Sequence, residues 1–156
     1  MHIEVDDLTR AAVHELLSEH LANMYELSPA ENVFALDLAK LRAPGITFWT
    51  VWEGDLLLGC GALKELSAGH GEIKSMRTPE AHRRRGAGRA VLNRIVDEAR
   101  RRGYRTLSLE TGSHPAFHSA QALYQSVGFV RCGPFGSYRE DPHSVFMSLQ
   151  LGAPAA

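Results

Sequence analysis

Hydrophobic and polar residues in the first part of this chain follow the spacing of a helix. Over residues 9–27, apolar side chains recur every three or four positions, after a short extended segment at His2–Val5. Ser28-Pro29 interrupts this pattern, and a second helical segment is predicted over residues 30–41, before Pro44-Gly45. The first part of the chain is therefore expected to be mainly helical.

The pattern then changes to the shorter period of β-strands. Residues 46–53 and 56–66 are rich in β-branched and aromatic side chains and surround Gly54-Asp55, which predicts a hairpin. A third strand over residues 72–78 follows the turn at residues 69–71. Beyond it the predicted elements are helices over 87–102 and 116–127, strands over 105–111, 129–133 and 144–149, and a frayed end over 152–156.

The helix predicted over residues 87–102 has one apolar stripe, which is expected to pack on a sheet. Val91, Leu92, Ile95 and Val96 form the stripe, and the opposite face is charged. The strands before and after this helix should then run parallel, joined by a right-handed crossover. Hairpins followed by such a βαβ unit predict an α/β (α+β) fold with a mixed sheet.

The composition is that of an ordinary globular protein, and we expect one domain over residues 1–156. The chain is 44% hydrophobic and 22% charged with a net charge of −1, so it is not a nucleic-acid-binding polycation. No apolar run approaches the roughly 20 residues that span a bilayer, and the first residues lack the features of a signal peptide. We expect a cytoplasmic protein, a monomer or homodimer, with Cys60 and Cys132 as free thiols in its core.

One glycine-bearing loop joins a predicted strand to a predicted helix, with the sequence Arg83-Arg84-Arg85-Gly86-Ala87-Gly88. The first amide N–H groups of a helix have no partner within the helix and carry partial positive charge. Glycines let the backbone close around an anion, and arginine side chains can reach phosphate oxygens. The loop is therefore predicted to bind a phosphate group.

Three common kinds of phosphate-binding site do not fit this loop. A P-loop requires Lys-Ser or Lys-Thr after its second glycine, where this chain has Arg89-Ala90. A dinucleotide-binding loop requires a third glycine three residues further on, where this chain has Val91. No aromatic residues are interleaved with the arginines, so we expect no nucleic-acid partner.

The pattern that remains is Arg83, Gly86 and Gly88, followed in the next helical region by Leu123-Tyr124 and Gly128-Phe129. On these residues the chain resembles the GNAT superfamily of N-acetyltransferases, which bind acetyl-CoA. The segments Leu109-Glu110-Thr111-Gly112 and Pro134-Phe135-Gly136-x-Tyr138-x-x-Asp141-Pro142 resemble a bacterial subgroup of small stand-alone members, mostly assigned to small-molecule amines. The resemblance implies a mostly antiparallel sheet whose central parallel pair of strands is splayed to admit CoA.

The resemblance also implies which residues bind acetyl-CoA. The amides of residues 84–89 would hold the pyrophosphate, residues 76–78 would pair with the pantetheine arm as with an added strand, and Tyr124 would lie near the thioester sulfur. Many family members have a pantetheine-contacting asparagine where this chain has Phe117, so that contact is lost or replaced. The predicted cofactor-binding residues are Met76, Arg77, Thr78, Arg83, Arg84, Arg85, Gly86, Ala87, Gly88, Arg89, Phe117 and Tyr124.

Acetyl transfer to an amine requires proton transfers at both the attacking and the leaving group. An alkyl amine, with a pKa of about 10, is mostly protonated at neutral pH, so a base must take its proton before it attacks the thioester. Glu72 and Glu110, on the two central strands, are the candidate bases, and a water chain without a dedicated carboxylate is the alternative. A backbone N–H near Met76 would stabilise the oxyanion, and Tyr124 would protonate the departing thiolate.

The acceptor is the less defined half of the reaction, with Ser28, Asn32 and Tyr138 as its predicted contacts. No metal is expected, because a proline separates His114 from His118 and no third ligand is evident. The predicted function is transfer of an acetyl group from acetyl-CoA to the primary amine of a small molecule by direct attack in a ternary complex. The alternatives are a non-catalytic module that binds acyl-CoA and acetylation of a protein amine; no membrane partner is expected.

Overall fold

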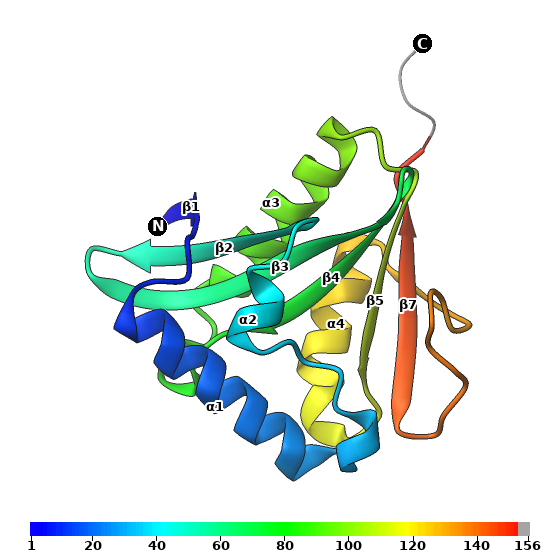
Figure 1. Ribbon diagram of the computed structural model, residues 1–156, viewed down its shortest axis with the longest axis horizontal. Coiled ribbons are helices and arrows are strands. Elements are labelled where there is room, and N and C mark those ends of the chain that lie inside the picture. The colour runs from blue at the N-terminus through cyan, green and yellow to red at the C-terminus, as the bar shows by residue number, and fades with distance from the viewer. Residues whose placement is uncertain (153–156) are drawn as a thin grey trace.

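A seven-stranded sheet forms the centre of the computed structural model, which describes residues 1–152 (Figure 1). The strand order is β1-β2-β3-β4-β5-β7-β6, and all neighbours are antiparallel except β4 and β5, which are parallel. The predicted mixed, mostly antiparallel sheet is thus confirmed. The strands are β1 (His2–Val5), β2 (Ile46–Glu53), β3 (Leu56–Ser67), β4 (His70–Arg77), β5 (Thr106–Gly112), β6 (Val130–Cys132) and β7 (Ser144–Gln150).

Helices cover both faces of the sheet, with α1 and α2 in front and α3 and α4 behind in Figure 1. The predicted stripe of α3, from Val91 to Val96, is buried against the sheet. No helix within residues 1–152 is both long and apolar enough to cross a membrane. The helices are α1 (Ala11–Leu27), α2 (Leu38–Leu41), α3 (Ala87–Arg101) and α4 (His118–Val127), with single 3₁₀ turns η1 (Ala30–Asn32), η2 (Glu80–His82) and η3 (Pro115–Phe117).

The parallel strands β4 and β5 pair over only part of their lengths. Their register begins with His70 opposite Thr106 and ends with Ile73 opposite Leu109. Beyond that point β4 remains paired with β3, and β5 remains paired with β7 as far as Gly112. The sheet therefore opens between β4 and β5 toward their carboxyl ends, as the sequence resemblance implied.

A bulge in β4 lies beside this opening. Between Lys74 and Arg77, β4 has one more residue than the facing part of β3, and neither Ser75 nor Met76 has a register partner there. Ser75 has a φ of +56°, in the left-handed region that residues with a side chain seldom adopt. A bulge leaves its extra residue out of the ladder, so backbone groups near Met76 are released from pairing with β3.

Two predictions from the sequence are wrong. The helix expected over residues 30–41 is instead η1, an extended segment and the short α2. Phe34 in the extended segment packs edge to face on Tyr138, with 5.0 Å between ring centroids, so a tertiary contact overrides the helical pattern. Cys132 is exposed on the edge strand β6, whereas Cys60 is buried as expected, and both are free thiols. Residues 153–156 of the predicted frayed end lie outside the described part of the chain.

Candidate active site

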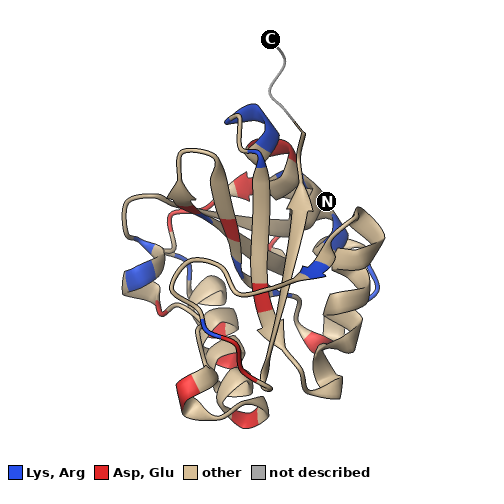
Figure 2. Cartoon of the chain, turned by 90° about the vertical axis from the view of Figure 1, so that its right-hand side faces the viewer, with Lys and Arg blue, Asp and Glu red and all other residues tan. Residues whose placement is uncertain are grey.

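Two carboxylates of the central strands share the face of the sheet that α1 and α2 cover. Glu72 of β4 and Glu110 of β5 alternate with Ile73 and Leu109, which belong to the core on the α3 side. Figure 2 shows acidic positions within the strands at the middle of the sheet. Since Glu72 is in register with Ser108, Glu110 lies further along β5, just past the last paired residue. The two candidate bases are therefore neighbours at the point where the sheet opens.

Glu72 is engaged in a buried hydrogen-bonded group with Tyr138 and Lys74. The Tyr138 hydroxyl donates to Oε2 of Glu72 over 2.5 Å, and Nζ of Lys74 lies 3.3 Å from the same oxygen and 2.9 Å from the Tyr138 oxygen. Burial is the main cause that raises the pKa of Tyr138, and the negative charge of Glu72 is the second. The hydroxyl therefore stays protonated and remains a hydrogen-bond donor. This group ties the loop before β7 to β4 and occupies the carboxylate of Glu72.

Glu110 is less engaged than Glu72. Its Oε2 accepts one hydrogen bond, of 3.1 Å, from Oγ of Ser144 on the adjacent strand β7. Burial raises the pKa of Glu110 to about 7, against the opposing effects of the Ser144 hydroxyl and the Lys74 ammonium. A carboxyl group with this pKa takes up and releases a proton near neutral pH. The geometry therefore suits Glu110 to proton transfer better than Glu72.

Tyr124 lies on α4, on the opposite face of the sheet from the two carboxylates. The residue is 6% exposed, and its ring centroid is 5.9 Å from that of Phe129. Burial raises the pKa of the Tyr124 hydroxyl, which is therefore protonated at neutral pH. A buried, protonated hydroxyl at this position is chemically able to donate a proton to a ligand that enters the opening.

The loop before α3 presents a row of backbone amides. Gly86, the N-cap of α3, has a φ of +84°, and Arg84 has a φ of +68°. Within the described residues, the amides from Arg84 to Arg89 donate to no backbone acceptor. Amides that point outward from a loop and a helix N-terminus form an anion-binding concavity. This loop, residues 84–89, is called the phosphate seat below. Its backbone geometry is that of an anion-binding site, as the sequence predicts.

The arginines around this loop differ in what their side chains can reach. The side chain of Arg77 turns to α1, where Nη1 donates to Asn23 over 2.8 Å and Nη2 donates to Glu19 over 3.1 Å. Only the backbone of Arg77 is thus left to face the opening. Nη2 of Arg89 donates to Oγ of Ser126 over 2.9 Å and joins α3 to α4. The side chains of residues 83–85 are exposed.

Phe117 lies over the end of β5. Its ring is so close to Gly112 that a Cβ at that position would overlap it. The side chain of Gln121, one turn further along α4, donates to the carbonyl of Gly112 over 2.9 Å and fixes this corner. The mouth of the opening is therefore lined by an aromatic ring where the family resemblance implied an amide.

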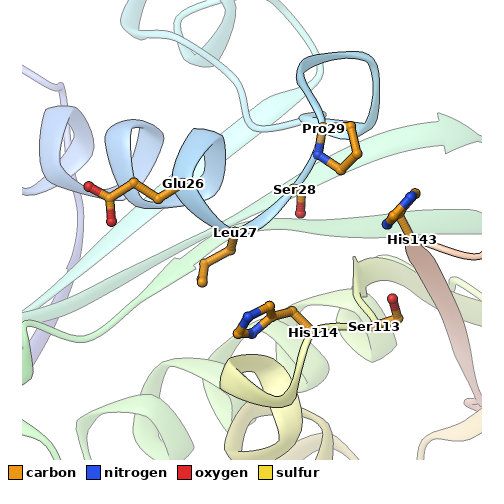
Figure 3. Close-up of a pocket in the computed structure, with 7 residues that line it drawn as sticks. All are labelled: Glu26, Leu27, Ser28, Pro29, Ser113, His114 and His143. Atoms are coloured by element: carbon orange, nitrogen blue, oxygen red, sulfur yellow. The ribbon is translucent and has the colours of Figure 1, made fainter.

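A cavity of about 420 Å³ lies between the end of α1, the loop after β5 and the loop before β7 (Figure 3). Figure 3 shows Leu27 and His114 facing the same space, with Ser28 and His143 along its edge. Ser28, a predicted acceptor contact, thus lines a cavity. The complete lining is Glu26, Leu27, Ser28, Pro29, Ser113, His114 and His143.

A second cavity, of about 290 Å³, lies over β3 and β4 beneath the loops of residues 33–36 and 135–138. Tyr138, also a predicted acceptor contact, lines this cavity. Asn32 lines neither cavity; it is buried, and the pKa of Asp141 is lowered first by the backbone N–H of His143 and then by the nearby Asn32 side chain. The lining is Val33, Phe34, Ala35, Leu36, Lys40, Lys64, Leu66, Glu72, Lys74, Phe135, Gly136, Ser137 and Tyr138.

The sequence predictions did not include Lys74, His114 or His143 among the site residues. Lys74 alternates with Glu72 on the polar face of β4, and this period of two is a signal that could have identified it. The histidines lie in irregular loops, where no such periodicity exists. Within residues 1–152, no group of three or more His, Cys, Asp or Glu side chains could hold a metal ion.

Comparisons with known proteins agree with this architecture. The model of the acetyltransferase (GNAT) family matches residues 10–129. The uncharacterized N-acetyltransferase YsnE of Bacillus subtilis is 57% identical over 151 residues, which cover 97% of this chain and 100% of YsnE. The IAA acetyltransferase of Azospirillum brasilense is 40% identical over 141 residues, 90% of this chain and 91% of that protein. A solved structure from Klebsiella pneumoniae, assigned as an acyl-CoA N-acyltransferase, superposes with a TM-score of 0.81 at 30% identity, covering 97% of both chains.

Proposed function

Because this chain belongs to the GNAT acetyltransferase family, we propose that it moves the acetyl group of acetyl-CoA to the primary amine of a small molecule within a ternary complex. We further propose that residues 1–156 form one such domain. The observation that carries the proposal is the opening of the sheet after Ile73 and Leu109. Glu110 lies on the face of the sheet that α1 covers, and Tyr124 lies on α4 at the opposite face. In the proposed reaction they act as base and acid on the two sides of this opening.

The donor half of the site comes from the loop before α3 and from β4. The free amides of residues 84–89 bind the pyrophosphate, and the exposed side chains of residues 83–85 add positive charge. Beyond Ile73 the edge of β4 toward β5 has no partner strand, and there the backbone at Met76, Arg77 and Thr78 pairs with the pantetheine arm as with an added strand. The ring of Phe117 contacts the apolar part of that arm.

The acceptor half requires a base, and Glu110 suits this role. Its carboxylate takes a proton from the ammonium form of the acceptor, directly or through a water molecule. The amine nitrogen then forms a bond to the thioester carbonyl carbon, and a backbone N–H near Met76 donates to the oxyanion. When the carbon–sulfur bond breaks, the electron pair leaves on sulfur, and Tyr124 gives its proton to the thiolate. The extra proton on the newly bonded nitrogen then passes to the Tyr124 phenolate, directly or through a water molecule, which leaves a neutral amide and restores the tyrosine.

Glu72 has a positioning role in this scheme. Its Oε2 is already held by the Tyr138 hydroxyl and the Lys74 ammonium, so taking a further proton there would disrupt buried hydrogen bonds. The carboxylate instead fixes the loop before β7 over the site. Of the two candidate bases, we therefore propose Glu110 as the one that takes the proton.

Thiol release from acetyl-CoA tests the proposal. The protein is assayed with a panel of primary amines and, separately, with IAA, the compound named in the IAA acetyltransferase that it resembles. Turnover that depends on one amine supports the transferase. Tight CoA binding without turnover of any small amine or of protein amines would instead support a non-catalytic module.

Initial-rate patterns then test direct attack. When the concentrations of both substrates are varied, intersecting lines in the double-reciprocal plots of initial rate indicate a ternary complex. Parallel lines and an acetylated enzyme would contradict it, because the proposed route forms no bond between the enzyme and the acetyl group.

A further inference from the structure

All three lysines of this chain line one cavity, the second of the two described above. They are Lys40, Lys64 and Lys74, and every other basic residue, apart from the histidines, is an arginine. We refer to this space, bounded by the residues that line it, as the lysine cavity. It adjoins Glu72 and Lys74, next to the point where β4 and β5 separate. Whatever occupies it lies beside the proposed site of acetyl transfer.

The charges in the lysine cavity do not cancel. Lys74 is paired with Glu72, the one carboxylate among the lining residues. Lys40 and Lys64 form no ion pair anywhere in the described part of the chain. Two positive charges are therefore left for a ligand, and a purely cationic amine would be repelled by them.

The remainder of the lining is apolar and aromatic. Phe135 and Phe34 each pack edge to face on Tyr138 at 5.0 Å between ring centroids. Leu36 and Leu66 add aliphatic surface. With a volume of about 290 Å³, the cavity has room for a small molecule with a flat or branched apolar part.

From this lining we propose that the acceptor carries a carboxylate together with its amine, as an amino acid with an apolar side chain does. Lys64 and Lys40 bind the carboxylate, the aromatic residues enclose the side chain, and the amine is directed to Glu110. This inference rests on the proposed acetyltransferase function and names the class of its acceptor. Charge-assisted hydrogen bonds to an ammonium are the strong interactions expected of such a site.

Matched acceptors test the inference. Phenylalanine, leucine and methionine are each compared with their amides and with the amines that lack the carboxyl group, at equal concentrations of unprotonated amine. We expect kcat/KM to be about tenfold or more higher for the acid than for its amide, the effect of losing one charge-assisted hydrogen bond. Equal or faster acetylation of the amides and simple amines would overturn the inference while leaving the transferase function intact.

A lysine variant tests which residues read the carboxylate. Lys64→Gln should reduce the ratio of kcat/KM for acid over amide by about tenfold. Arg94→Gln, which removes the same charge from an exposed position on α3, should leave the ratio unchanged. An unchanged ratio in Lys64→Gln would contradict the assignment.

A binding measurement keeps the inference testable if no amine in the panel is acetylated. N-acetylphenylalanine and its amide are titrated into the wild-type chain and into Lys64→Gln. Tighter binding of the acid, lost in Lys64→Gln, supports the carboxylate site even though the absence of turnover counts against the transferase. Equal binding of acid and amide overturns the site.

Discussion

The hydroxyl of Tyr138 donates a hydrogen bond of 2.5 Å to Oε2 of Glu72, a carboxylate on the central strand β4. The ammonium group of Lys74 donates hydrogen bonds to both side chains, so Tyr138, Glu72 and Lys74 form one hydrogen-bonded group. The loop before β7 is thereby fixed over the face of the sheet where the acceptor is proposed to bind. The contact supports the proposed role of Glu72 as a positioning residue.

Tyr138→Phe should therefore reduce both stability and acceptor binding. Loss of a hydrogen bond to a buried carboxylate is expected to lower the free energy of unfolding by about 1–3 kcal/mol. The KM for the acceptor should rise more than kcat falls, because the hydroxyl positions the loop without touching reacting atoms. Chemical denaturation and initial rates measure these effects. Tyr25→Phe, at an exposed position on α1, is the control, and equal behaviour of the two variants would argue against the positioning role.

Glu110→Gln should abolish the acid limb of the pH–rate profile. If the carboxylate is the base, kcat/KM of the wild type rises with pH as a group with a pKa of about 7 loses its proton. Glutamine cannot take a proton, so activity should fall by about 10²–10⁴-fold and this limb should disappear. Glu53→Gln, at an exposed strand end, controls for the change of charge. A limb that survives in Glu110→Gln would assign it to another group.

The same substitution should stabilise the fold at higher pH. Burial raises the pKa of Glu110 from 4.5 to about 7, so between these values the folded chain binds more protons than the unfolded chain. The contribution of Glu110 to the free energy of unfolding is thus fully present below pH 4.5 and is lost as the pH rises through 7. Glu110→Gln lacks this decline. From pH 5 to pH 8, the denaturation midpoint of the wild type should therefore fall further than that of the variant.

Local sequence signals predicted most of the fold. The hairpin around Gly54-Asp55 and the apolar stripe of α3 are short-range patterns, and both elements formed as expected. The segment after η1 was mispredicted because its conformation depends on Phe34 meeting Tyr138, a residue remote in sequence. Contacts between distant positions leave no periodic trace, so a helix was inferred where the chain is extended.

The candidate site divides along the same line. The loop before α3 and Tyr124 are marked by motifs within single elements, so sequence alone pointed to them. In the sequence, Tyr138 is 64 residues from Lys74 and 66 residues from Glu72. These three residues become neighbours only when the loop before β7 folds back over the sheet. The choice between Glu72 and Glu110 also depends on burial and hydrogen bonding, which the sequence does not specify.

Tyr124→Phe should separate catalysis from cofactor binding. The hydroxyl is buried and protonated, and its proposed role is to protonate the departing thiolate, so kcat should fall by about 10²–10⁴-fold. The Kd for CoA should change by less than about twofold, because the ring and its packing on Phe129 remain. Tyr104→Phe, at another buried tyrosine whose hydroxyl bonds Glu65, is the control. An unchanged kcat in Tyr124→Phe would remove the general-acid role.

Gly86→Glu should weaken CoA binding through the phosphate seat. The new carboxylate would lie at the N-terminus of α3, among the free amides proposed to hold the pyrophosphate, and would repel it. We expect the Kd for CoA, measured by calorimetry, to rise by about tenfold or more, equivalent to about 1.4 kcal/mol.

Gly45→Glu is the matched control for this variant. Gly45 has a φ of +85°, nearly that of Gly86 at +84°, and a Cβ at either position would meet no atom closer than 3.8 Å. Both substitutions therefore add the same charge and the same left-handed strain, and both should lower the free energy of unfolding by about 1 kcal/mol. Because Gly45 precedes β2, away from the loop before α3, its variant should bind CoA as the wild type does. If both variants lose CoA affinity equally, backbone strain is the cause and the phosphate seat lies elsewhere.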